Sequence, residues 1–137
     1  MTLNSEQLRT LMVNAREALQ ALESFSTMSK QEFLADKKTI WLVRYNFIIA
    51  LQACIDICNH IASRKGNRAP TSSADCFAVL EEQGIIPGDL CTGMQRLTDL
   101  RNALVYLYWK INDEKVFDSL QNDLGIIREY LTTISRL

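Results

Sequence analysis

The chain has 137 residues, of which 47% are hydrophobic, enough for one compact core and too few for two ordinary domains. Its 15 basic and 16 acidic side chains leave a net charge of -1, whereas nucleic-acid-binding domains usually have a pI above about 9. The composition therefore predicts a single domain over residues 1–137 and excludes nucleic-acid binding driven by overall charge, so any contact with RNA needs a local cationic patch.

The N-terminal part of the chain contains two helix starts. Asn4 followed by Gln7 resembles a capping box, and apolar residues at helical spacing then predict an amphipathic helix over residues 5–25. Ser29 followed by Glu32 repeats the capping signal, so a second and brief helix is expected directly after a short turn.

The segment from about Asp36 to Ser63 is the most apolar of the chain. It is long enough to cross a membrane, but five polar residues within it would be too costly in lipid. These residues are Arg44, Asn46, Gln52, Asp56 and Asn59. We therefore predict no membrane span and a helix buried on most sides. In so small a domain one side, around Ile48 and Ile55, is expected to meet a second copy of the chain.

The polar residues of this helix form a stripe. Gln52, Asp56 and Asn59 fall on one face. The stripe either faces solvent or faces the later helix that carries Arg101 and holds its polar groups. His60, the only histidine, follows Asp56 by four residues, which allows an ordinary helical hydrogen-bonded pair. His60 is also a candidate catalytic base, but nothing in the sequence places it beside Arg101.

Residues 64–70 are predicted to form a loop, because they contain a glycine and a proline that end a helix. The three cations of this loop indicate either a solvated turn or, if a dimer brings the loop near Arg101, a local attraction for phosphate. Ser72 or Ser73 then caps a helix that Gly84 ends.

The next helix is predicted from about Asp89 past Tyr106. Positions seven apart on a helix return to within roughly 20° of each other, so Arg101 and Tyr108 would share a face. Four-residue spacing likewise pairs Asn102 with Tyr106. A guanidinium, a carboxamide and two phenols would thus gather within about two turns. This pattern indicates either a functional site or a helix end anchored by aromatic side chains.

The last part of the chain is predicted to be one more helix. Asn112 and Asp113 offer a cap, and an apolar stripe continues from Glu114 to about Ile134. No stretch alternates in the manner of a strand. The predicted fold is therefore all-α, an up-and-down bundle of about five or six helices.

The sequence gives no sign of a metal, a cofactor or a secretory signal. Cys54, Cys58, Cys76 and Cys91 fit neither a disulfide framework nor the paired spacing of a zinc site, so we expect buried thiols. Glycine-rich phosphate loops are missing from the sequence. Residues 1–20 lack a basic segment followed by an apolar one, and a cytoplasmic protein is expected.

The segment RNALVYLYW at residues 101–109 resembles the motif of the HepT-like toxins of the HEPN superfamily, in which an Arg is followed, a few residues on, by His, any residue and Tyr. Tyr106 stands at the position of that His. Residues 44–60 resemble the central helix of the family, and residues 77–86 its next helix and turn. The resemblance extends over about residues 35–130.

This resemblance implies a HEPN-like, dimeric, metal-independent ribonuclease toxin of a type VII toxin-antitoxin pair, with tRNA as one candidate substrate and a higher oligomer as one candidate assembly. It also implies a nucleotidyltransferase partner, MntA, that attaches AMP to the motif Tyr, here Tyr108. In such a ribonuclease the ribose 2'-hydroxyl attacks the adjacent phosphorus, the motif His handles a proton, and the Arg, here Arg101, stabilises phosphoryl charge. Asn102 and Asp99 are expected to position the substrate.

Tyr106 is a poor substitute for the motif His. A phenol has a reference pKa of about 10 and an imidazole of about 6.5, so only the imidazole is a useful base near neutral pH. Losing this assistance is expected to slow cleavage by about 10²- to 10⁴-fold. The chain is therefore predicted to be an impaired enzyme. Two alternatives stay open: a non-catalytic helical subunit that binds substrate for a nucleotidyltransferase, and a purely structural helical dimer.

Overall fold

The computed structural model describes residues 5–137, and these residues form seven helices and no strand. In chain order the helices are α1 (Ser5–Phe25), α2 (Lys30–Ala35), α3 (Lys37–Lys65), α4 (Ser73–Glu82), α5 (Gly88–Tyr106), α6 (Asp113–Asn122) and α7 (Leu124–Ser135). The all-α prediction is confirmed.

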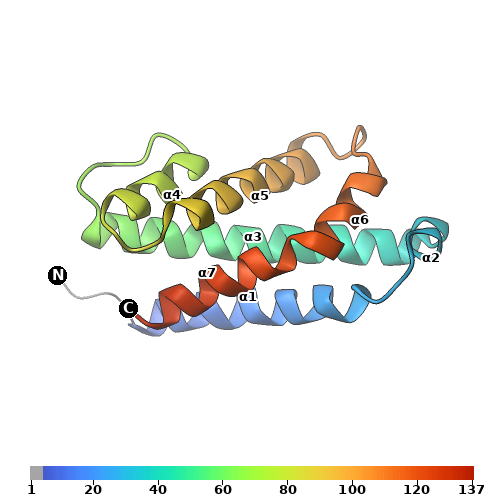
Figure 1. Cartoon of the computed structure of the whole chain (residues 1–137), viewed down its shortest axis with the longest axis horizontal. Coiled ribbons are helices and arrows are strands. Elements are labelled where there is room, and N and C mark those ends of the chain that lie inside the picture. Colours follow the sequence, from blue (N-terminus) through green and yellow to red (C-terminus); the bar gives the residue numbers. More distant parts are fainter. Residues whose placement is uncertain (1–4) are drawn as a thin grey trace.

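The long helix α3 runs through the middle of the bundle (Figure 1). Figure 1 shows α1 along one side of α3 and the pair α4 and α5 along the other. The last helix, α7, packs against α1, α5 and α3, and thereby closes the bundle. The exit of α5 lies toward the end of the bundle where α3 begins, so segments far apart in the sequence meet there (Figure 1).

Helix starts follow the capping signals of the sequence. The capping box of α2 is present in both directions, because Ser29 Oγ accepts from the Glu32 amide and Glu32 Oε1 accepts from the Ser29 amide. Of the two candidate caps for α4, Ser72 is the one used, and its Oγ accepts from the Asp75 amide at 3.0 Å. The predicted cap at Asn4 lies outside the described residues.

The expected single C-terminal helix is broken into α6 and α7 at Asp123. This residue has φ -111° and ψ -5°, and its carboxylate accepts from Arg96 of α5 at 2.9 Å. Asp and the nearby Gly125 are poor helix formers, which favours a break here, and the contact with Arg96 accompanies it. The described chain consequently has seven helices where five or six were expected.

By length and composition, α3 is the one helix of residues 5–137 that could cross a membrane. Its neighbours show a different role, because α1, α2, α4, α5 and α7 all pack against it and its side chains supply much of the core. Ile55 is only 2% exposed within this core and Ile48 is half-buried. The prediction that a second copy covers Ile55 is therefore wrong, since helices of the same chain already bury it.

The four cysteines are free and buried, which confirms the expectation of buried thiols. Burial raises the pKa of the Cys54 and Cys58 thiols far above their usual range. Burial, together with a hydrogen bond to Glu81, raises the pKa of Cys91 to about 11. These thiols are protonated at neutral pH and are poor nucleophiles.

Candidate functional site

The helix that carries the motif ends earlier than predicted. α5 covers Gly88–Tyr106, Leu107 is its C-cap, and the chain then enters a turn. Tyr108 therefore lies outside the helix, and its predicted stacking over Arg101 is wrong. The early exit makes Tyr108 part of an exposed connection between α5 and α6.

Arg44 of α3 holds this connection. Its Nη1 donates to the backbone carbonyl of Tyr108 at 3.1 Å, while its Nε and Nη2 contact the Asp113 carboxylate at 2.8 and 2.7 Å. Because Asp113 is the first residue of α6, one guanidinium joins α3, the turn and α6. No role for Arg44 at this site was predicted from the sequence. The sequence did contain a signal for this role, because a partly buried cation within an apolar helix requires a polar or charged partner.

Arg101 lies beneath the surface, between α5 and α4. It is 9% exposed, and its Nη2 is 3.4 Å from Ser73 Oγ, at the first turn of α4. Its Nε is buried and finds no hydrogen-bond partner among the described residues. Within residues 5–137 the guanidinium also forms no ion pair. No carboxylate of these residues therefore pairs with its positive charge.

The two motif tyrosines are exposed. Tyr106 is 63% exposed and Tyr108 is 64% exposed, and the Tyr108 ring meets Trp109 edge-on with ring centroids 5.4 Å apart. Tyr106 leaves the helix about 140° around from Arg101, which explains why one side chain is exposed and the other buried. The structure therefore exposes both phenols at the exit of α5 and turns the Arg101 guanidinium inward, toward α4.

The two residues predicted to position substrate lie on the same part of α5. Asp99 is exposed and Asn102 is half-buried. Among the described residues no hydrogen bond joins Asn102 to Tyr106, although the two lie one helical turn apart. Asp99 is thus accessible to solvent, and Asn102 is partly accessible.

The polar stripe of α3 faces α1 and solvent. Gln52 donates to Asp56 at 3.0 Å, and Asp56, Asn59 and His60 line a hollow between α3 and α1. The alternative in which the stripe holds the polar groups of α5 is therefore wrong. Burial and then the charge of Arg64 lower the pKa of His60, so this imidazole is neutral at pH 7.

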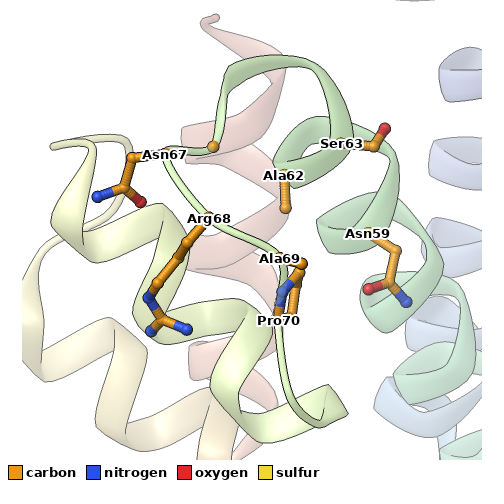
Figure 2. Close-up of a pocket in the computed structure, with 8 residues that line it drawn as sticks. Asn59, Ala62, Ser63, Asn67, Arg68, Ala69 and Pro70 are labelled. Atoms are coloured by element: carbon orange, nitrogen blue, oxygen red, sulfur yellow. The ribbon is translucent and has the colours of Figure 1, made fainter.

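The loop after α3 borders a hollow of about 560 Å³ (Figure 2). Figure 2 shows the Arg68 side chain extending from this loop along α4. Arg68 contacts Asp75 at 2.6 Å and Glu82 at 2.8 Å, and its hydrogen bonds hold the pKa of the Asp75 carboxyl well below its usual range. Since two carboxylates neutralise it, Arg68 offers little attraction for phosphate, and the solvated-turn interpretation of this loop fits the structure better.

These features define a class: a small helical bundle in which one helix carries a buried arginine without an ion pair and exposes tyrosines at its exit. The chain belongs to the ribonuclease HepT-like family, whose sequence profile matches residues 15–134. Over 105 residues it is 30% identical to the mRNA nuclease HepT of Shewanella oneidensis, a match that covers 77% of this chain and 76% of the relative.

Solved structures show the same fold. The chain resembles a tri-AMPylated HEPN toxin of Shewanella oneidensis in complex with its MNT antitoxin, with a TM-score of 0.86, 24% identity, and coverage of 95% of this chain and 97% of that one. It also resembles YutE, a cytosolic protein of unknown function from Bacillus subtilis, with a TM-score of 0.84, 11% identity, and coverage of 98% and 90%. The HEPN-like fold predicted from the motif is confirmed.

Proposed function

We propose that this chain is a HepT-type ribonuclease toxin that an MntA-type nucleotidyltransferase holds inactive by attaching AMP to Tyr108. The observation that carries the proposal is the buried Arg101, which forms no ion pair within residues 5–137 and lies on the helix that ends at Tyr106. A buried charge without an ionic partner is unfavourable for folding, so its presence points to a functional requirement for positive charge. A phosphodiester would supply the missing negative charge.

In the proposed reaction a ribose 2'-hydroxyl attacks the neighbouring phosphorus, and Arg101 stabilises the charge that develops on the phosphoryl oxygens. A guanidinium suits this role because it stays charged and binds phosphate in a bidentate manner. Asn102 and Asp99 position the RNA, and the chemistry needs no metal. The remaining task is proton transfer, and Tyr106 performs it poorly. Both tRNA, from the resemblance, and mRNA, from the Shewanella relative, are substrates to be compared.

The phenol at position 106 also favours a second candidate function. A chain with Arg101 but no motif His would still bind RNA phosphate while cleaving it slowly. Such a chain would serve as a non-catalytic substrate-binding subunit of the nucleotidyltransferase. Restoring the motif His separates the two functions, since only a ribonuclease scaffold would gain cleavage.

The partner interaction is tested by incubating the purified chain with an MntA-type nucleotidyltransferase and ATP. We expect the two proteins to elute together from a sizing column and the chain to gain the mass of one or more AMP groups. A matched incubation without ATP should give the complex without the adduct. A chain that neither binds the partner nor gains AMP would contradict the proposal.

We further propose a homodimer formed at the exit of α5. Large exposed apolar side chains of residues 5–137 come mostly from two stretches, residues 41–45 and 105–109. The contact of Arg44 with Tyr108 brings these two stretches together. A cluster of exposed aromatic side chains is unusual on a monomer. Pairing of two copies through Trp41 and Tyr45 of α3 would shield the α3 side of this surface and leave Tyr108 at its edge, open to the nucleotidyltransferase.

The dimer gives a measurable prediction. The parent is expected to be dimeric by light scattering at micromolar concentration, and the double change Trp41→Ala and Tyr45→Ala is expected to give monomers, because these rings are 63% and 60% exposed at the proposed interface. Val13→Ala removes a side chain that is 48% exposed on α1 and serves as the control. A monomeric parent would contradict the dimer, and a dimer that survives the double change would place the interface elsewhere.

The proposed protein is a single HepT-like domain over residues 1–137 that acts in the cytoplasm, where RNA and ATP are both present. It needs no cofactor of its own, since ATP enters as the substrate of its partner.

A further inference from the structure

We infer that Arg44 is a positioning residue that presents Tyr108 for AMP attachment, an inference that rests on the proposed function. Arg44 contacts the backbone of Tyr108 and never its phenol. Its role would be to fix where the phenol stands, and it takes no part in the chemistry.

The connection that carries Tyr108 is held at few points. The rings of Tyr108 and Trp109 are mostly exposed, and their contact with each other ties neither to a helix. Local backbone hydrogen bonds close the turn, from the Leu107 amide to α5 and from the Lys110 amide to the Leu107 carbonyl. Among these contacts, the bond from Arg44 is the one that attaches the Tyr108 backbone to the central helix.

The geometry at Arg44 depends on a guanidinium. Three of its donor nitrogens act at once, two on the Asp113 carboxylate and one on the Tyr108 carbonyl. Nε and Nη2 both contact Oδ1 of Asp113, so the carboxylate holds one edge of the guanidinium while Nη1 donates to the carbonyl. The side chains of Arg44 and Asp113 are only 20% and 25% exposed, so water competes weakly for the ion pair, while the bond to the Tyr108 carbonyl lies at the exposed surface. A lysine ammonium is a single point charge that lacks this planar fork and cannot reproduce all three contacts.

Positioning matters because the transfer requires in-line attack. The Tyr108 phenol oxygen attacks the α-phosphorus of ATP, the new bond to phosphorus forms as the bond to pyrophosphate breaks, and the phenolic proton passes to solvent. Displacements near 1 Å can reduce such reactions by about 10²-fold. A turn released from α3 would sample many positions, and few of them would bring the phenol into line.

The test uses three variants in the complete chain, assayed with the partner nucleotidyltransferase and ATP. Arg44→Gln removes the charge, Arg44→Lys keeps it, and the double change Arg44→Asp with Asp113→Arg reverses the ion pair. The reversed pair can restore attraction between α3 and α6, but an aspartate at position 44 cannot donate to the Tyr108 carbonyl. Arg128→Gln breaks the ion pair with Glu23 between α7 and α1 and is the matched control.

We expect Arg44→Gln to lower kcat/KM for AMP transfer roughly 10- to 100-fold, mainly through kcat, while Arg128→Gln stays near the parent. Arg44→Lys is expected to recover part of the loss. The reversed pair is expected to recover thermal stability and leave transfer slow. A merely structural role of Arg44 predicts the opposite, with stability and transfer restored together. Transfer at the parental rate in Arg44→Gln, or full recovery in the reversed pair, would overturn the inference.

Hydrogen exchange separates this inference from the proposed function. If the parent gains no AMP, the proposed modification is wrong. The positioning of the turn by Arg44 is then tested by hydrogen exchange at the Leu107 and Lys110 amides. Faster exchange in Arg44→Gln and in the reversed pair, with α1 unchanged, would support positioning of the turn by Arg44. Exchange equal to that of the parent would overturn it.

Discussion

Replacing Tyr106 by His is expected to raise RNA cleavage by about 10²- to 10⁴-fold, the usual contribution of general acid-base assistance. The side chain at position 106 is 63% exposed, so an imidazole fits there without repacking the core. Expression of Tyr106→His without the partner should arrest growth more strongly than expression of the parent. Cleavage is measured on tRNA and on mRNA, with the parent in parallel. If Tyr106→His cleaves no faster than the parent, the result contradicts the ribonuclease function and favours the non-catalytic binding subunit.

The same background tests Arg101. The double variant Tyr106→His with Arg101→Met should lose the restored cleavage, because the side chain that stabilises phosphoryl charge is gone. Met roughly keeps the volume of the buried side chain, and removing an unpaired buried charge should leave the melting temperature close to that of Tyr106→His. Retained cleavage in a folded double variant would remove Arg101 from the catalytic role.

Tyr108→Phe is expected to abolish the AMP adduct, whereas Tyr106→Phe should keep it. Both phenols are exposed, so accessibility alone does not separate them. Their positions distinguish them, because Tyr108 lies in the turn that Arg44 contacts and Tyr106 lies on the last turn of α5. Only one hydroxyl is removed in each variant, and neither change disturbs the core. Mass spectrometry of proteolytic fragments identifies the modified tyrosine.

An adduct on Tyr108 would add bulk and negative charge at the surface where RNA is proposed to bind. In Tyr106→His the modified protein should therefore lose its restored cleavage, and Tyr108→Phe in that background should stay active in the presence of the partner. An adduct that persists unchanged in Tyr108→Phe would assign the modification to another residue.

The helices of this chain follow from local signals, and the exit of α5 does not. Capping side chains such as Ser29 and Asn112 act on amides two or three residues away, within reach of a sequence pattern. No glycine or proline directly follows Tyr106 to end the helix, so the sequence pattern predicted a helix that continues past this residue. The contact that accompanies the exit joins Arg44 to Tyr108, residues 64 positions apart.

The candidate site was predictable to the same extent. The order of Arg101, Tyr106 and Tyr108 along the chain predicted the family, which the match over residues 15–134 confirms, while the roles of these three side chains stay predictions. Helical spacing could not reveal that Arg101 faces α4, because its contact with Ser73 depends on how the two helices pack. The break at Asp123 was missed for a similar reason, since Arg96, its partner, belongs to another helix.

The four buried cysteines allow unfolding of the chain to be measured by thiol reactivity. A thiol that is shielded and protonated reacts slowly with an alkylating reagent, and the same thiol reacts quickly once the chain opens. Cys54 and Cys58 lie on α3 and Cys91 lies on α5, the helices that carry Arg44 and Arg101. The rate of alkylation thus reports the fraction of unfolded molecules in each variant. It distinguishes a folded variant that has lost activity from a variant that has unfolded.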